Sequence, residues 1–460
     1  MIRFGLVLGL GLSLVATTAS ADSGTPDNIP GISATTPGIT PEGALAPISV
    51  VEGAGFKVGE GTVLHPIVGL ETGVISNVFN ETSAEGPKSA GILRLIAQIG
   101  TGSLSPQRLA VTAEGVNGGS PETSGPTANG NLGSLQYRAD LRLSYDLYLS
   151  GNENLQAQNG LGIGGLFRGT VFPQRTWSFL YLENFQRVIR STNFESRDQT
   201  NRDVNRVQLG LQFAPGGRAI TGLLHYENVI DFFESSDQQF ANRIQHSAGL
   251  TASWRFRPMT VFFADATMGY FSGLGGASTK VDSFPLTVSA GAQTLLTLNT
   301  SLIAHVGYTN GFYANNTASF SSILGGLQAG YRYAHTGRVT AMYDYSHQDS
   351  INANFFRDHL VRVEIEQQFV PFVVHVAPEI RFRRYEGVTS VIGAAGMDVR
   401  DDIIVSVSAG ARYNFRDWFA GVVEYRLNAV QTNFTYMSGN VLDDPSYVRH
   451  ELIAGVRAAL

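Results

Sequence analysis

The segment 135–150, LQYRADLRLSYDLYLS, alternates apolar and polar residues without interruption. Every second residue from Leu135 to Leu149 is aliphatic or aromatic, whereas the residues between them include two arginines and two aspartates. Successive side chains of a strand point to opposite faces, so this segment has one apolar face and one polar face. Strands in soluble sheets are usually about five or six residues long, whereas a tilted strand needs about 9–11 residues to cross a bilayer. The segment therefore predicts a membrane-spanning strand with lipid on one side and water on the other.

The same period of two recurs along most of the chain and predicts about eighteen strands. An even number is typical of bacterial outer-membrane barrels made from one chain. The predicted fold class is all-β, a transmembrane antiparallel up-and-down β-barrel. Pro378 lies inside one of the segments, and because proline donates no ladder hydrogen bond we expect a bulge there. The predicted strands are 64–76, 90–100, 134–150, 160–172, 176–188, 205–214, 219–231, 244–256, 260–271, 285–295, 301–312, 322–334, 338–347, 357–369, 372–384, 403–415, 418–429 and 447–460.

The connections between these segments alternate in length. Short, turn-like ones occur at 215–218, 257–259, 335–338 and 416–418, and longer polar ones at 189–204, 232–243, 272–284, 386–402 and 430–446. Short periplasmic turns and longer outer loops are typical of outer-membrane barrels, whereas a β-sandwich would not explain the alternation. The segment 101–133 lies on the short-turn side despite its length. It is either a disordered insertion or a contact for a periplasmic partner.

The N-terminus has the features of a secretory signal: Arg3, an apolar run from Phe4 to Val15, and a small-residue cleavage site that ends at Ala21. We predict a signal peptide at 1–21, a disordered periplasmic segment at 22–61 and an outer-membrane barrel at 62–460. Cleavage near Ala21 would deliver the chain to the outer membrane of a Gram-negative bacterium. The alternating apolar C-terminal strand, which ends at Leu460, resembles the signal recognised by the barrel assembly machinery. That machinery and outer-membrane lipid are the expected partners.

Composition excludes several classes of protein. The chain has 460 residues, of which 15% are charged and none is cysteine, and its mean hydropathy is +0.01. A helical membrane protein would need runs of about 20 apolar residues, whereas an alternating barrel keeps its average hydropathy near zero. The absence of cysteine excludes disulfides and thiolate metal sites. The formal net charge of −6 gives no reason to expect nucleic acid as a partner.

Candidate catalytic and cofactor motifs are weak. Residues 160–165 match G-x-G-x-x-G, but a dinucleotide site needs a helix after the motif, and here a further strand is predicted. Glycines within a strand explain the match, so we predict no cofactor. The nine histidines lack metal-ligand spacing, so we predict no metal site. A barrel hydrolase would need a histidine such as His246, His305 or His375, but no G-x-S-x-G motif accompanies them, and we predict that the chain is not an enzyme.

The polar faces of the predicted strands are the best candidates for a functional surface. Their charges have two interpretations. They could form weak, repeated hydrogen bonds with passing hydrated solutes, or they could pair across neighbouring strands and fill the barrel. The sequence does not decide between them. The candidate lumen-facing residues are Arg138, Asp140, Arg142, Asp146, Arg362, Glu364, Glu366, Glu379, Arg381, Arg383, Glu424 and Arg426.

Several strand starts and turns resemble those of a known family. They are GEGTVLHP at 59–66 before SNVF at 76–79, RDVNR at 202–206 before PGG at 215–217, and WRFRP at 254–258 before DAT at 265–267. Over roughly 60–460 the chain resembles the beta-barrel porin 2 class of outer-membrane proteins, especially myxobacterial forms. The resemblance implies a channel for passive passage of hydrophilic cargo. The cargo that it favours is an exported polysaccharide, handed over by a periplasmic polysaccharide export protein. The alternatives are a diffusion porin for small hydrophilic solutes and a closed structural or adhesive barrel.

Overall fold

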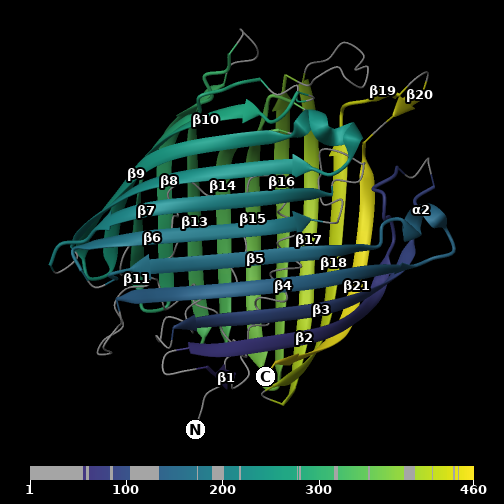
Figure 1. The fold of residues 1–460 in the computed structure, drawn as a ribbon, viewed down its shortest axis with the longest axis horizontal. Coiled ribbons are helices and arrows are strands. Elements are labelled where there is room, and N and C mark those ends of the chain that lie inside the picture. The colour runs from purple at the N-terminus through teal and green to yellow at the C-terminus, as the bar shows by residue number, and fades with distance from the viewer. Residues whose placement is uncertain are drawn as a thin grey trace.

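The chain forms a closed antiparallel β-barrel of 18 strands (Figure 1). Each barrel strand pairs with the next along the chain, and the first, β2, also pairs with the last, β21, which closes the barrel. No helix among the residues described is long and apolar enough to cross a membrane. The computed structural model describes residues 55–58, 62–82, 86–103, 134–173, 175–188, 201–216, 219–276, 278, 281–314, 320–350, 353–387, 399–416, 418–438, 441–443 and 445–459.

The barrel strands agree with the sequence prediction to within a few residues at each end. They are β2 (Thr62–Ile75), β3 (Ala90–Ser103), β4 (Leu135–Leu149), β5 (Gly160–Val171), β6 (Trp177–Val188), β7 (Arg202–Phe213), β8 (Ile220–Phe233), β9 (Arg243–Arg257), β10 (Thr260–Gly273), β11 (Leu286–Thr297), β12 (Thr300–Asn310), β13 (Ser321–Ala334), β14 (Gly337–Asp349), β15 (Phe355–Phe369), β16 (Phe372–Glu386), β17 (Val399–Arg416), β18 (Phe419–Thr432) and β21 (Tyr447–Ala459). The predicted fold class is confirmed.

The prediction of a bulge at Pro378 is wrong, because the strand register continues through this residue. On one side of β16, Glu379 pairs with Arg362 and Val376 with Ile365, which is one continuous register. On the other side Pro378 itself pairs with Val407. Proline removes one hydrogen-bond donor from the ladder, and here that loss leaves the register unchanged.

The connections alternate in length as predicted. We call the end where β2 begins and β21 finishes the periplasmic end, in line with the predicted orientation. The connections 258–259 and 335–336 lie there and are tight turns. At the other end, the connections carry α2 (Glu153–Gln156), the 3-10 helix η4 (Ser236–Ala241), and a hairpin of β19 (Tyr436–Ser438) and β20 (Val441–Asp443).

The N-terminal segment is described only in part. The two-residue strand β1 (Phe56–Lys57) pairs with Val63 and Leu64 of β2. The predicted signal peptide at 1–21 lies outside the described residues, as do residues 22–54 and 104–133. The assignments made for them stay predictions.

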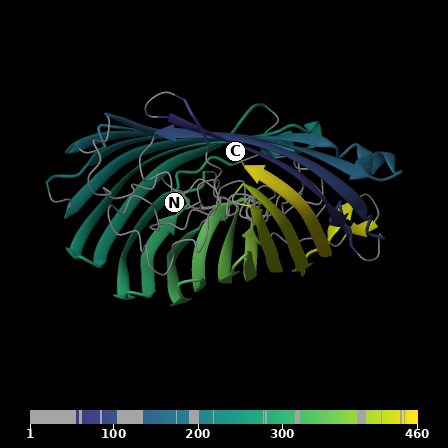
Figure 2. The same cartoon turned by 90° about the horizontal axis from the view of Figure 1, so that it is seen from below.

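The barrel is flattened, so that two curved walls face each other. Figure 2 shows β2 to β9 along one wall and the strands from β11 onward along the other, and Figure 1 shows the strands of the two walls crossing. Crossing is expected because barrel strands tilt by about 35–45° from the barrel axis.

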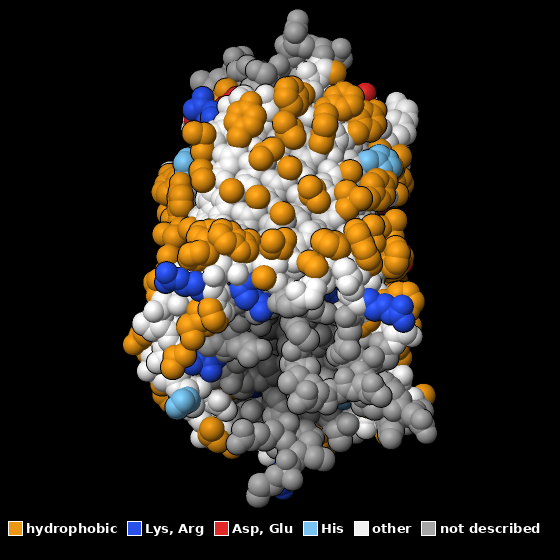
Figure 3. Space-filling view, turned by 90° about the vertical axis from the view of Figure 1, so that its left-hand side faces the viewer, with side chains coloured by type: hydrophobic (Ala, Val, Ile, Leu, Met, Phe, Trp, Pro, Cys, Tyr) orange, Lys and Arg blue, Asp and Glu red, His pale blue; other side chains and the backbone are white. Residues whose placement is uncertain are grey.

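The outer wall is apolar and the inner wall is polar, the reverse of a soluble protein. In β4, Leu135, Leu141 and Leu149 are 51%, 48% and 54% exposed, whereas the intervening Asp146 is 1% exposed. Figure 3 shows hydrophobic side chains over the described outer wall, with Lys and Arg side chains gathered below its lower band. The exposed apolar residues form the surface that a bilayer would cover, since large contiguous apolar patches are rare on soluble monomers.

Candidate functional site: the polar inner wall

The candidate site is the inner wall on both sides of the seam between β2 and β21. Side chains alternate between the two faces of a strand, so every second residue of these strands points into the barrel. Many of these inward residues are arginine, aspartate or glutamate. Such charges can be buried only if they are paired and hydrogen-bonded. Many of these charges form hydrogen-bonded ion pairs with one another.

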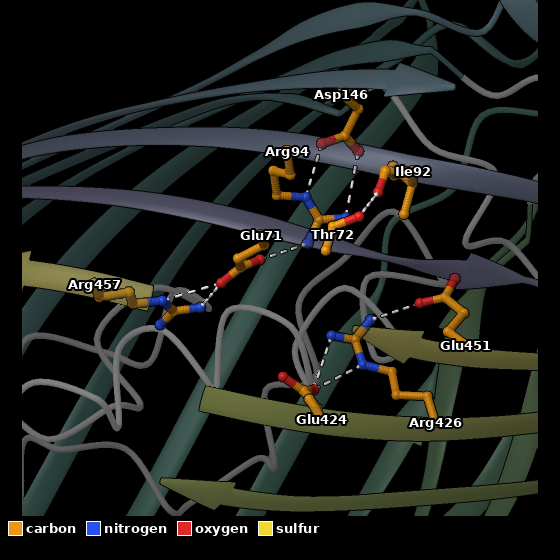
Figure 4. A network of polar contacts seen from close by, with 9 residues as sticks. All are labelled: Glu71, Thr72, Ile92, Arg94, Asp146, Glu424, Arg426, Glu451 and Arg457. Atoms are coloured by element: carbon orange, nitrogen blue, oxygen red, sulfur yellow. Dashed lines mark hydrogen bonds and ion pairs between the residues drawn. The ribbon is translucent and has the colours of Figure 1, made fainter. Parts of the chain in front are cut away.

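The first network crosses the seam (Figure 4). Arg94 on β3 donates from Nε to Asp146 Oδ1 on β4 over 2.7 Å, and from Nη1 to Glu71 Oε2 on β2 over 3.3 Å. Glu71 also accepts from Arg457 on β21, with an Nε–Oε1 distance of 3.0 Å. Arg94, Glu71 and Asp146 are 3%, 2% and 1% exposed. The network therefore links four consecutive strands where the barrel closes.

A second network lies beside it on β18 and β21, also drawn in Figure 4. Arg426 donates to Glu424 from Nε and Nη2, each over 3.0 Å, and from Nη1 to Glu451 over 3.4 Å. Glu451 also accepts from Arg449. All four side chains are buried. Acids and arginines thus alternate along and across these two strands.

A third network spans β15 to β17. Arg383 makes a bidentate pair with Asp358, at 2.7 and 2.6 Å, and its guanidinium lies 3.8 Å from the ring centroid of Phe356. Arg381 donates to Glu379 over 2.6 Å. On β17, Arg400 and Asp402 form a further bidentate pair, at 2.8 and 2.6 Å. Planar bidentate pairs of this kind are the strong class of charge-assisted hydrogen bond.

The structure distributes the predicted lumen-facing residues among several environments. Asp146, Glu379, Arg381, Arg383, Glu424 and Arg426 belong to the three networks above. Arg362, Glu364 and Glu366 form a more open cluster, in which Arg338 lies 3.0 Å from Glu366 and 3.5 Å from Glu364. Asp140 and Arg142 lie on β4 between these charges and the periplasmic end. The backbone of Arg138 pairs with Gly102 and Arg168, and its side chain lies outside the described part of the structure.

The Nη1 atom of Arg142 is one of several buried arginine nitrogens of the described wall that have no hydrogen-bond partner. Arg142 lies over Gly164 of β5, where a Cβ would be 3.6 Å from Nη2. Ser144 lies over Gly162 in the same way. The G-x-G-x-x-G match at 160–165 is therefore part of a strand whose inward glycines make room for side chains of β4, and no helix follows it.

Several charged residues of the wall were missed by the sequence prediction. Arg449, Glu451 and Arg457 fall on one face of the predicted last strand, so continuing the alternation would have found them. Glu71 and Arg94 are isolated charges in otherwise apolar segments. Asp402 was assigned to a loop because the predicted strand began at 403, whereas β17 begins at Val399.

The inner wall of β11 to β13 is mostly uncharged. Ser289, Gln293, Ser301 and Thr309 are buried there, with glycines between them. His305 of β12 lies 3.9 Å from Asp344 of β14. Strands β11 to β13 therefore give the lumen a stretch of wall built mainly from hydroxyl and amide groups.

The three histidines considered for a barrel hydrolase do not converge. His246 is on the outer wall, where it contacts Tyr226, whereas His305 and His375 are on separate strands, β12 and β16. Among the residues described, no group of three or more His, Cys, Asp or Glu side chains could hold a metal ion.

Comparisons with known proteins find likeness only in shape. No protein-family model and no curated protein matches the chain. Acinetobacter baumannii OccAB4 is 10% identical, with 86% of this chain and 98% of that chain covered and a TM-score of 0.44. Pseudomonas aeruginosa OccK2 (OpdF) is 12% identical, with 86% and 98% covered and a TM-score of 0.45. The resemblance to the porin 2 class is not confirmed by these comparisons.

Proposed function

We propose that the chain is an outer-membrane channel through which small hydrophilic solutes diffuse passively. The observation that carries the proposal is the inverted polarity of a closed barrel of this size, apolar outside and charged or hydroxyl-bearing inside. Barrels of 16–18 strands are wide enough to leave an aqueous channel. A polar inner wall is what such a channel requires, whereas a closed structural barrel could be filled with apolar side chains.

The pairing of the wall charges favours a channel with little preference for one sign of charge. Glu71, Asp146, Glu424 and Glu451 each contact an arginine, so much of the fixed charge is compensated locally. A compensated wall offers passing solutes hydrogen bonds that are weak enough to release them.

Polysaccharide export, which the family resemblance favours, is not what we propose. That cargo rested on the resemblance alone, and neither a family model nor a feature of the described wall supports it. The diffusion porin, the alternative from the sequence, agrees better with a wall of closely paired charges.

Swelling of proteoliposomes tests the proposal. Purified protein is reconstituted into vesicles, which are diluted into isosmotic pentose, hexose, disaccharide or trisaccharide. We expect swelling that is fastest for the pentose and falls steeply with solute size. Vesicles that hold the folded barrel but do not swell in pentose would refute the channel. If a trapped long polysaccharide left the vesicles as fast as a disaccharide, the result would favour polysaccharide export over the diffusion porin.

A further inference from the structure

Three tyrosine–histidine pairs recur on the outer wall. In each pair the tyrosine hydroxyl lies within hydrogen-bond distance of histidine Nδ1 on the neighbouring strand. The distances are 2.8 Å for Tyr226–His246, 2.9 Å for Tyr343–His359 and 2.9 Å for Tyr425–His450. The ring centroids are 6.2, 6.2 and 6.1 Å apart, so the three pairs share one geometry.

The pairs also share one position in the strand pattern. Each tyrosine is the seventh residue of a strand that runs away from the periplasmic end, namely β8, β14 or β18. Each histidine lies on the barrel strand that follows. Equal strand positions counted from the periplasmic turns place the three pairs at a similar height on the barrel.

That height matches the far edge of the lipid band. On β9 and β15, His246 and His359 lie ten residues from Phe256 and Phe369, the outward aromatic residues near the periplasmic end. Ten residues at a rise of about 3.3 Å, tilted by about 40°, span about 25 Å. The apolar band of outer-membrane barrels is about 25 Å tall. The pairs therefore stand where hydrocarbon gives way to headgroups.

The surroundings of His246 indicate which ring nitrogen carries the proton. Asn228 Nδ2 lies 3.3 Å from His246 Nδ1 and donates to the Gln245 carbonyl over 3.1 Å, which fixes the orientation of the amide. An amide nitrogen can only donate, so Nδ1 accepts and the proton of the neutral ring is on Nε2. Tyr226 and Tyr343 are 39% and 42% exposed, and His359 and His450 are also exposed. A ring N–H at the edge of hydrocarbon needs an acceptor.

The distribution of the pairs identifies the kind of partner. They lie on β8–β9, β14–β15 and β18–β21, so four strands, then two, and then the six strands from β2 to β7 separate successive pairs around the barrel. A partner protein on one side of the barrel could not face all three, whereas lipid surrounds the whole circumference.

We propose that the three pairs are binding sites for phosphate groups of membrane lipids. In each, the tyrosine hydroxyl donates to Nδ1, which keeps the proton on Nε2, and Nε2–H donates to a phosphate oxygen. The proposal is independent of the channel function.

Lipid binding in a phosphate-free detergent tests this. Protein in dodecyl maltoside is titrated with short-chain phosphatidylglycerol, and native mass spectrometry counts the bound lipids. We expect up to three more phospholipids on the wild type than on H246F/H359F/H450F, and an affinity roughly tenfold higher, as for hydrogen bonds to a charged group. A galactolipid with the same chains should bind both proteins equally. H335F, in a periplasmic turn, is the matched control and should bind as the wild type does.

Three results would overturn the proposal. Phosphatidylglycerol binding that is equal in wild type and triple variant would overturn it. So would ¹⁵N NMR spectra of the wild type that place the proton of His246, His359 and His450 on Nδ1. Y226F/Y343F/Y425F keeps the histidines and should weaken phospholipid binding less than the histidine variant. Retention of a protein instead of phospholipid at these positions would also contradict the proposal.

Discussion

Asp146→Asn removes the main partner of a buried arginine while keeping the size of the side chain. Arg94 makes its shortest contact, 2.7 Å, with Asp146, and only the 3.3 Å contact to Glu71 would keep full charge. Both residues of the pair are at most 3% exposed, so solvent cannot replace the lost carboxylate. Breaking a buried pair by removing one partner costs about 3–5 kcal/mol. Because Glu71 remains, we expect the lower end, about 3 kcal/mol, or roughly 150-fold in the unfolding equilibrium constant.

Equilibrium unfolding in urea, with the barrel in lipid vesicles and tryptophan fluorescence as the signal, measures this change. Two variants serve as references. Glu81→Gln breaks the Lys88–Glu81 pair at 3.3 Å, in which the lysine side chain is 43% exposed, and should change stability by less than about 1 kcal/mol. The double replacement R94M/D146L removes both charges and should lie within about 1 kcal/mol of the wild type, since apolar side chains of similar volume can replace a buried pair.

The reasoning is refuted if D146N is as stable as E81Q. That result would mean that water reaches Arg94 and that the seam network is solvated. A double variant that is less stable than D146N would also contradict it, because the loss could not then arise from an unpaired charge.

Three further predictions concern the seam, the wall charge and the position in the membrane. A Cβ at Gly73 would overlap the backbone carbonyl of Leu452 across the seam, so G73A should unfold at clearly lower urea than G165A, where nothing lies within 4 Å of the added Cβ. Glu366→Gln removes the 3.0 Å contact of Arg338 and should shift the reversal potential in a KCl gradient toward anion preference, whereas a shift toward cations would contradict the assignment of Arg338 to the lumen. Trp177, Trp254 and Trp418 are 51%, 49% and 52% exposed near the periplasmic end, so lipids brominated near the headgroup should quench fluorescence more than lipids brominated at the chain end.

The strands could be predicted because their signal is local. Alternation within 135–150 requires only that one face meets lipid and the other water, and no partner strand has to be known. The connections could be predicted for the same reason. The alternation of tight turns and long loops can be read from the sequence without knowing how the strands pair. Pro378 was misjudged because the effect of one missing donor depends on the neighbouring strands, which hold the register there.

The partners of the charges could not be predicted, because they depend on register between strands. Arg94 faces Asp146 across β3 and β4, whose connection is the long segment after Ser103, and no local rule sets that pairing. The Tyr226–His246 contact also depends on register, because it runs diagonally between strands: the direct partner of Tyr226 is Ala248. Sequence therefore located the charged face, whereas the networks and the outer pairs required the assembled barrel.

The central claim is that the barrel conducts hydrophilic solutes, and conductance in planar bilayers tests it most directly. Folded protein is added to a bilayer in KCl, and the tryptophan quenching described above verifies insertion in parallel vesicles. We predict stepwise increases in current to long-lived open levels whose size rises with KCl concentration and which show only weak preference between K⁺ and Cl⁻. Inserted protein that leaves the bilayer electrically sealed would contradict the account.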